Sequence, residues 1–530
     1  MSRTRTMLMA VSVCLLAAVL FCQPARAEEA KGEEGVRLSL ADALRSALEN
    51  NLGLVIARRD PRIAALNVDL AKAVFDPVLG GTFQHSYSKT EEILQPDFST
   101  GTLQFVSIGS KTTNDNAGAT WTQLLNFGGT YQVGLNSSRS DQSPSFRSYN
   151  PSINTGLTFG WSMPLLKGYG SEATTENLVM AKRGVEMSDA DLKRQAQLTI
   201  ESVEDAYWDL VAAGETLAVA KKSLKLAQDL YDLNKRKVEV GTLAPIEITQ
   251  AEAGVASREE GVILAEAGLA SSQDNLRQLL AVPKDSRLWD QPIVPTDQPT
   301  FEPRSPDLGR AIEKALESRG EMTSARLDLQ NKQLAEQVAR RRLRPQLDLT
   351  AGVTPSGNNI IGQRVVGTDV QPIVGGLSDS FTEIPKFRNY DWSVGLVLTY
   401  PLGNRREQAG YATATLTREK AELSLVNTDL TVRVDVRTAV RNIESGVKRV
   451  TAARSNTLLQ QKKLEAEQKK FENGMSTSFE VLTFQTDLAN AQQAEIQAMT
   501  DYNKALAALE RAQGTLLEAR NLRMESGTRK

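Results

Sequence analysis

A seven-residue apolar repeat runs through both halves of this chain and constrains its fold more than any other feature. In the first half the repeat positions are Val203, Leu210, Leu217, Leu224, Tyr231 and Val238. In the second half they are Val436, Ile443, Val450, Thr457, Leu464 and Phe471, at a shift of 233 residues. The same shift places Gly241 on Gly474. A heptad pattern of this length is typical of coiled coils, so the sequence predicts long packed helices in duplicate.

Proline and glycine interrupt the two halves at matching places. No proline occurs between Pro164 and Pro245, and none after Pro401. We therefore expect long helices at 172–240, 245–281, 403–473 and 477–520. At 1.5 Å per residue the first would be roughly 100 Å long, which suits a rod or a tube. Two turns are expected to reverse the chain at the end of the rod; their residues are Val240, Gly241, Thr242, Asn473, Gly474 and Met475.

A second internal repeat indicates the domain organisation. LADALRSALENN begins at Leu40 and LGRAIEKALESR at Leu308, and both contain Ala-x-x-x-Ala-Leu-Glu. We expect a first repeat, an equatorial connector, a second repeat and a tail, at 28–282, 283–306, 307–520 and 521–530. The connector holds six of the 19 prolines, so it is expected to lie against the helices without regular structure.

Segments of alternating polarity lie between the helices, at 77–165 and 345–400. Such alternation predicts strands with one apolar face. We expect strands at 77–86, 117–125, 130–137, 152–165, 345–353 and 390–400, with 354–389 as an external loop. A half-buried sheet in a soluble protein would show the same pattern, but small and polar opposite faces favour a transmembrane β-barrel. Four aromatic residues are expected at its membrane interfaces: Phe159, Trp161, Trp392 and Tyr400.

The N-terminus carries a secretory pattern at 1–27. Arg3 and Arg5 precede an apolar run, and Ala25-Arg26-Ala27 forms an A-x-A cleavage site. Lipidation at Cys22 is the alternative, which bulky Phe21 disfavours. Both cysteines fall inside this segment, so disulfides, thiol catalysis and cysteine metal sites are excluded from the exported chain.

Several function classes lack support in the remaining sequence. The formal net charge of −2 gives no basis for nucleic-acid binding. His85 is the single histidine, so a multi-histidine metal site is excluded. No Walker loop, nucleophile elbow or HExxH motif occurs. We therefore expect neither an enzyme nor a bound cofactor or metal.

The duplicated order of elements resembles the TolC-like outer-membrane efflux proteins. The segments that carry the resemblance are VGTLAPIEITQAEAGVASRE (240–259), NGMSTSFEVLTFQTDLANAQ (473–492), MPLLKGYG (163–170) and YPLGNRREQAG (400–410). The resemblance implies an α+β homotrimer whose strands share one barrel in outer-membrane lipid and whose helices form a periplasmic tunnel. It further implies a periplasmic adaptor that contacts the two glycine turns, an inner-membrane transporter as a second partner, and export of drugs, metals, dyes or polypeptides.

The chain departs from this family pattern in two places. Members typically have two strands per half, whereas the first half here predicts four; the additional hairpin at 117–137 would enlarge the barrel or fold over its mouth. The tyrosine and arginine that often hold the tunnel tip shut correspond to Phe471 and Ser476 here, so a tyrosine–arginine lock is not available at these positions.

Glu480 and its image Glu247 are candidates for the pore constriction, together with Phe471 and Ser476. The resemblance aligns Glu480 with a carboxylate that rings the pore, where three copies would attract cations. The alternative is helix capping, because 477–480 reads as a capping box with Glu480 at N3. Similarly, Pro245 would stand at N1 and Glu247 at N3 of the other helix. The two roles are compatible.

Three functions compete at this point. The first is an outer-membrane channel that exports small molecules or polypeptides from an efflux or secretion complex. The second is a secreted coiled-coil protein that bridges the cell envelope without conducting, which leaves the amphipathic strands unexplained. The third is a periplasmic enzyme on a helical scaffold, which has almost no residues in its favour. The sequence favours the channel.

Overall fold

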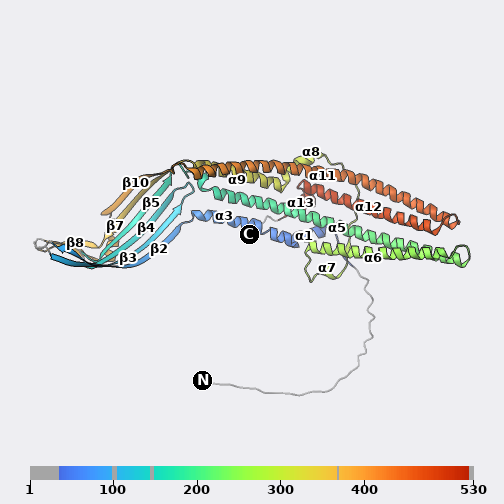
Figure 1. The fold of residues 1–530 in the computed structure, drawn as a ribbon, viewed down its shortest axis with the longest axis horizontal. Helices are drawn as coiled ribbons and strands as arrows, with labels where there is room; N and C mark the ends of the chain where they lie inside the picture. Colours follow the sequence, from blue (N-terminus) through green and yellow to red (C-terminus); the bar gives the residue numbers. More distant parts are fainter. Residues whose placement is uncertain (1–34, 98–103, 144–148, 367–368, 525–530) are drawn as a thin grey trace, which may run out of the picture.

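The computed structural model describes residues 35–97, 104–143, 149–366 and 369–524. The expected signal peptide at 1–27, with Cys22, lies outside these residues. The chain forms an elongated rod, with a sheet at one end and pairs of long helices at the other (Figure 1). Across the described residues, no helix combines the length and the apolarity that crossing a membrane requires.

The first repeat builds the longest helices from the predicted heptads. Its helices are α1 (Leu40–Asn50), α2 (Leu52–Ala57), α3 (Asp60–Lys72), the 3₁₀ turn η1 (Ala73–Phe75), α4 (Ser171–Thr174), α5 (Glu176–Glu239) and α6 (Ile246–Leu280). The helix expected at 172–240 is interrupted near its start, because Thr175 has φ −99° and ψ 10° and separates α4 from α5. The heptad residues Val203 and Leu210 are fully buried in α5, as the coiled-coil pattern predicts.

The second repeat has the same order of long helices. Its helices are α8 (Leu308–Ser318), α9 (Gly320–Arg342), α10 (Leu377–Glu383), the 3₁₀ turn η2 (Ile384–Lys386), α11 (Arg405–Glu472), α12 (Ser478–Ala512) and α13 (Leu516–Ala519). The helix expected at 477–520 is therefore two helices. Gly514, at φ +74°, ends the first because only glycine adopts this left-handed conformation without strain.

The connector between the repeats contains short regular elements that were not expected. Helix α7 (Arg287–Asp290) precedes β6 (Ile293–Pro295), which pairs in parallel with β1 (Val36–Leu38). The Tyr207 hydroxyl of α5 donates to Asp297 at 2.7 Å and lies 3.0 Å from the Leu38 carbonyl oxygen. These bonds hold the connector against the long helices.

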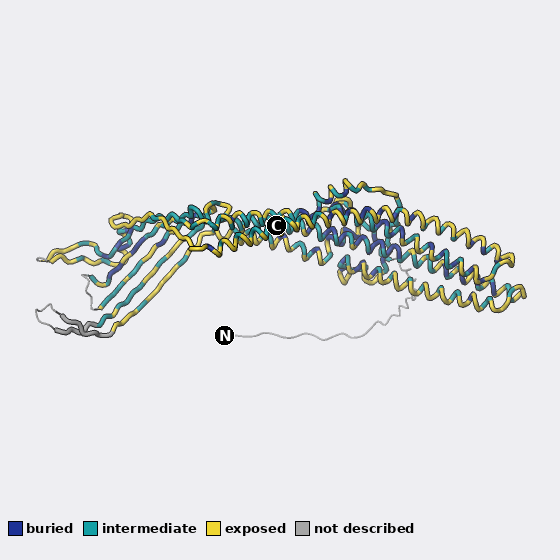
Figure 2. Tube along the Cα trace, turned by 45° about the horizontal axis from the view of Figure 1, so that its top comes forward, coloured by how far each residue is buried: buried dark blue, intermediate teal, exposed yellow. Residues whose placement is uncertain are grey.

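The helices nearest the sheet form a single layer in the order α3, α5, α9, α11. In the far half, α6 packs on α5 and α12 packs on α11, and the two pairs contact each other through α12 and α5. Buried residues concentrate in the middle of the helical body (Figure 2). One cluster there surrounds Tyr207 and Leu210, and a second surrounds Ile443 and Tyr502.

Six antiparallel strands from both repeats form one sheet in the order β10-β7-β5-β4-β3-β2. The strands are β2 (Val78–Asp97), β3 (Gln104–Leu124), β4 (Thr130–Ser143), β5 (Ser152–Pro164), β7 (Gln346–Asn358) and β10 (Asn389–Thr399). The additional hairpin, β3 and β4, lies inside the sheet between β5 and β2. It therefore widens the sheet.

The sheet has one apolar and one polar face. Directly paired residues of antiparallel strands share a face, so the register defines continuous rows. One row crosses all six strands and consists of Leu79, Trp121, Val133, Phe159, Val353 and Trp392. The adjacent row on the other face contains Gly80, Thr120, Gly134 and Thr158. The predicted alternation therefore holds across the whole sheet.

Two regions expected as irregular are regular. The first strand continues beyond 86 to Asp97 and pairs with β3, since backbone hydrogen bonds extend the hairpin where the side chains have become polar. The loop expected at 354–389 is replaced by the end of β7, the hairpin of β8 (Ile360–Val366) and β9 (Asp369–Val374), and α10. The segment connects β7 to β10 as expected, but its regular structure was not predicted because these residues lack a clear alternation.

Candidate functional site

Both reversals at the far end of the helical body are glycine turns of the same kind. Gly241 has φ +78° and Gly474 has φ +74°. After α5, the Thr242 N–H donates to the Lys237 carbonyl at 2.9 Å. After α11, the Met475 N–H donates to the Lys470 carbonyl at 2.8 Å. These are Schellman caps, so each turn depends on a glycine at the left-handed position. We call the two turns with the adjoining helix ends the tip.

The returning helices are capped differently from each other. The Thr477 hydroxyl caps α12 by accepting the Glu480 N–H at 3.3 Å, which is half of the predicted capping box. Helix α6 begins at Ile246, so Pro245 is its N-cap and Glu247 its second residue. The sequence had placed Pro245 at N1 and Glu247 at N3, so both predicted positions were too late in the helix by one residue.

The Glu247 carboxylate accepts the Ser478 N–H at 3.3 Å. A residue of the first repeat therefore satisfies a free N–H at the start of a helix in the second. Asn234 of α5 strengthens this connection, because its side-chain amide donates to the Ser478 hydroxyl at 2.7 Å and to the Glu247 carbonyl at 3.2 Å. Asn234 and Ser478 are fully buried, so the bonds are shielded from water.

Phe471 lies in a small apolar cluster at the tip. It is 3% exposed and packs with residues of three helices, Leu230, Leu464, Val481 and Leu488. The Lys237 ammonium lies 4.3 Å from the centre of its ring and donates to its carbonyl oxygen at 3.2 Å. At the position of the absent tyrosine, a phenylalanine therefore joins α11 to α5 through a cation–π contact.

Ser476 lies between two carboxylates. Its hydroxyl oxygen is 2.6 Å from Glu467 Oε1 and 2.7 Å from Glu480 Oε2. Lys470 pairs with the other oxygen of Glu467 at 2.9 Å. The hydrogen bond from Ser476, followed by that from Lys470, lowers the pKa of Glu467. Glu480 is exposed, so its charge faces solvent.

The outermost surface of the tip is apolar. Val240 is 78% exposed and Met475 is 70% exposed, each beside its glycine. Phe479, in the first turn of α12, is also exposed. Sequence reasoning missed Phe479, although its place beside the predicted turn could have indicated it. Within the described residues no group of acidic, histidine or cysteine side chains could hold a metal ion.

The family model of outer membrane efflux proteins matches residues 122–282 and 311–515, which is more than half of the chain. The chain belongs to this family.

Curated relatives of this efflux protein include Nodulation protein T of Rhizobium leguminosarum bv. trifolii, 22% identical over 381 residues that cover 70% of this chain and 73% of the relative. The outer membrane protein TolC of Escherichia coli (strain K12) is also 22% identical over 381 residues, covering 69% and 71%. The fold is similar to the crystal structure of the Campylobacter jejuni CmeC outer membrane channel, with a TM-score of 0.61, 18% identity, and coverage of 92% and 90%. The α+β fold expected from the sequence is confirmed.

Membership of this family places the efflux protein in the outer membrane, with the helical body as its large periplasmic portion. The solved structure that it resembles is a channel, and the protein is not an enzyme. The end of the sheet that joins the helices is therefore the periplasmic end. Aromatic side chains gather at that end: Trp121, Tyr131, Trp161 and Tyr400 each lie within four residues of it. The Trp121 indole N–H donates to the Tyr131 hydroxyl at 3.4 Å, and that hydroxyl donates to the Gln123 side chain at 2.5 Å. The sequence had not predicted a role for Trp121 or Tyr131.

The remaining predicted aromatic residues lie on the same face. Phe159 and Trp392 share the row that crosses the sheet, and Trp392 lies near the end of β10 that is farther from the helices. Both are exposed in the single chain.

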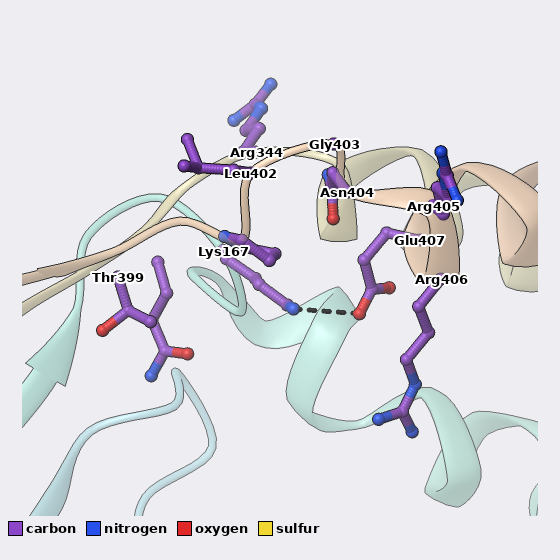
Figure 3. A pocket seen from close by; sticks show the side chains of 11 residues that line it. Lys167, Arg344, Thr399, Leu402, Gly403, Asn404, Arg405, Arg406 and Glu407 are labelled. Carbon is purple, nitrogen blue, oxygen red and sulfur yellow. Dashed lines mark hydrogen bonds and ion pairs between the residues drawn. The ribbon is translucent and has the colours of Figure 1, made fainter.

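A hollow of about 580 Å³ lies where the sheet meets the helices. Figure 3 shows its lining, to which Lys167, Arg344, Arg405 and Arg406 contribute four positive charges. Lys167 pairs with Glu407 at 3.1 Å, so one of these charges is neutralised. The hollow remains strongly basic, and no motif in the sequence had indicated it.

Proposed function

We propose that this protein is one subunit of a closed exit duct, in which three copies pool their sheets across the outer membrane and their helices across the periplasm. The observation that carries the proposal is that neither the sheet nor the helix layer next to it closes on itself within one chain. The sheet ends at β2 on one side and β10 on the other. The helix layer ends on the same sides, at α3, which leads into β2, and at α11, which follows β10.

The outer helices have the surfaces that such closure needs. Helix α3 exposes the apolar side chains of Ile63, Leu66 and Leu70 along one stripe. Helix α11 exposes Leu416, Leu423 and Leu430 at intervals of seven. A stripe of heptad spacing packs against another helix. Joining α3 of one copy to α11 of the next would bury both stripes and pair β2 with β10.

The tip is the end that meets the rest of an export complex. Exposed Val240 and Met475 offer apolar contacts to a periplasmic adaptor, whose inner-membrane transporter would supply the cargo. Glu480 faces solvent beside the turn and is the group we assign to the pore constriction. Behind it, Glu247 and Phe471 join the two repeats, whereas Ser476 joins α11 to α12. The cargo consists of small molecules or polypeptides.

The test is to reconstitute the full-length protein in planar lipid bilayers. We expect discrete channels formed by a complex of three copies, the mass of which is measured in detergent. A monomer without conductance would overturn the proposal and would favour a non-conducting coiled-coil protein. A substitution of Leu423 and Leu430 by glutamate should abolish assembly and conductance together, because it places charge in the surface between copies.

A further inference from the structure

The turn between β10 and α11 exposes an isolated leucine. Leu402 is 98% exposed. It follows Leu398 and Tyr400 at intervals of two, and these belong to the apolar face of the sheet. Figure 3 shows Leu402 on one side of the turn and Thr399 of the polar face on the other. The apolar face of β10 therefore continues past the end of the strand through Leu402.

Two arginines lie on the same side of the turn as Leu402. These are Arg344, just before β7, and Arg405, the first residue of α11 (Figure 3). Both are exposed, and in the described part of the chain neither pairs with a carboxylate. Arg406 points to the opposite side (Figure 3). One side of the junction therefore combines an exposed leucine side chain with two guanidinium groups that have no carboxylate partner.

This combination fits the interface of a phospholipid leaflet. Leucine favours the acyl region, and guanidinium groups bind phosphate through two parallel hydrogen bonds. The site lies at the periplasmic end of the sheet, beside Tyr400. We propose that Arg344 and Arg405 bind the phosphate of a phospholipid in the periplasmic leaflet, with Leu402 inserted among its acyl chains. This inference rests on the proposed position of the sheet across the membrane.

The charges predict which lipids the site prefers. On the side of the junction that bears Leu402, the hollow has the unpaired charges of Arg344 and Arg405. A lipid with net negative charge, such as phosphatidylglycerol, should therefore bind more tightly than zwitterionic phosphatidylcholine. Because the site lies between the last strand and the first turn of α11, a bound lipid would brace the junction of sheet and helix.

The experiment measures lipid binding to the full-length protein by native mass spectrometry. Delipidated protein in neutral detergent is titrated with phosphatidylglycerol, phosphatidylcholine or inorganic phosphate. We expect Arg405→Gln to weaken phosphatidylglycerol binding about fivefold, and Arg344→Gln with Arg405→Gln about 25-fold. Arg406→Gln is the matched control, since it removes the same charge one residue further on but from the opposite side.

Equal losses in Arg405→Gln and Arg406→Gln, or equal binding of both lipids, would overturn the site. Binding of inorganic phosphate without binding of either lipid would show a site for soluble anions instead and would also overturn the proposal. Leu402→Ser should weaken the binding of both lipids and leave the binding of inorganic phosphate unchanged. Flotation with liposomes separates this inference from the proposed function: a protein that does not float refutes the position of the sheet, whereas one that floats without lipid preference refutes only the site.

Discussion

The ammonium group of Lys237 lies 4.3 Å from the centre of the Phe471 ring and donates to the Phe471 carbonyl oxygen at 3.2 Å. Lysine and phenylalanine come from different repeats, and their contact joins α5 to α11 at the tip. The pair takes the place of the tyrosine–arginine contact that the sequence lacks. Movement of one helix pair relative to the other must break it.

Lys237→Met should loosen the tip without unfolding the protein. The substitution keeps the aliphatic stem but removes the cation–π contact and one hydrogen bond, together worth about 1–2 kcal/mol. We expect faster amide hydrogen exchange at both glycine turns. Lys235→Met is the control, because Lys235 is exposed in the same helical turn. Equal exchange in the two variants would show that the contact does not hold the tip.

Asn234→Ala should have a larger effect. It removes a buried amide that bonds Ser478 and Glu247, and leaving such partners unsatisfied costs about 1–3 kcal/mol. Conductance of the reconstituted channel should rise, since the two repeats are then less firmly joined. Asn473→Ala provides the comparison, because that side chain bonds only to Lys469 of its own helix, at 2.7 Å. A similar rise in both variants would contradict the assignment.

Gly474→Ala should destabilise the turn after α11. At φ +74° a Cβ atom is strained, and we expect a loss of about 1–2 kcal/mol in the free energy of unfolding. Gly268→Ala tests the same change inside α6, where the added Cβ would meet nothing within 4 Å apart from its own stretch of helix backbone. It should stabilise the helix by up to about 1 kcal/mol. Thermal unfolding distinguishes the two signs.

The raised pKa of Asp205 should make the stability of the protein depend on pH. Burial, reinforced by Glu201, Asp209 and Glu204, raises its pKa to about 6, although Lys504 opposes the shift. The unfolded chain releases this proton near pH 4, so the folded state binds more protons between pH 4 and 6 and loses stability as pH rises through this range.

Asp205→Asn should remove this loss. We expect a gain of about 2–3 kcal/mol at pH 7.5 and little change at pH 4. Chemical denaturation at the two pH values measures the difference. Asp209→Asn is the control and should give no gain, since its carboxylate pairs with Lys504 at 2.5 Å. A gain of the same size at both pH values would rule out titration of Asp205 as its cause.

Glu480→Gln should reduce the preference of the channel for cations and its block by multivalent cations. In a threefold complex the substitution removes three charges from the pore entrance. Reversal potentials in a salt gradient provide the measurement. Glu472→Gln, an exposed glutamate just before the turn, makes the same change in charge outside the first turn of α12. Unchanged selectivity in Glu480→Gln would remove this residue from the pore.

The sequence alone determined what is periodic or local. The heptads specified the long helices because every seventh position must be apolar to pack along a partner helix. Gly241 and Gly474 marked the reversals because a left-handed backbone strongly favours glycine. The period of two marked the strands and their apolar face, and the order of these elements indicated the family.

The tertiary structure alone decided which distant groups meet. Glu247 caps a helix 231 residues away, and Asn234 bonds Ser478 across 244 residues. Neither contact has a periodic signal, because it depends on how two separately formed helix pairs dock. The basic hollow has the same origin: Lys167, Arg344 and Arg405 belong to three segments of the chain, and only the pairing of β5, β7 and β10 brings them to one junction.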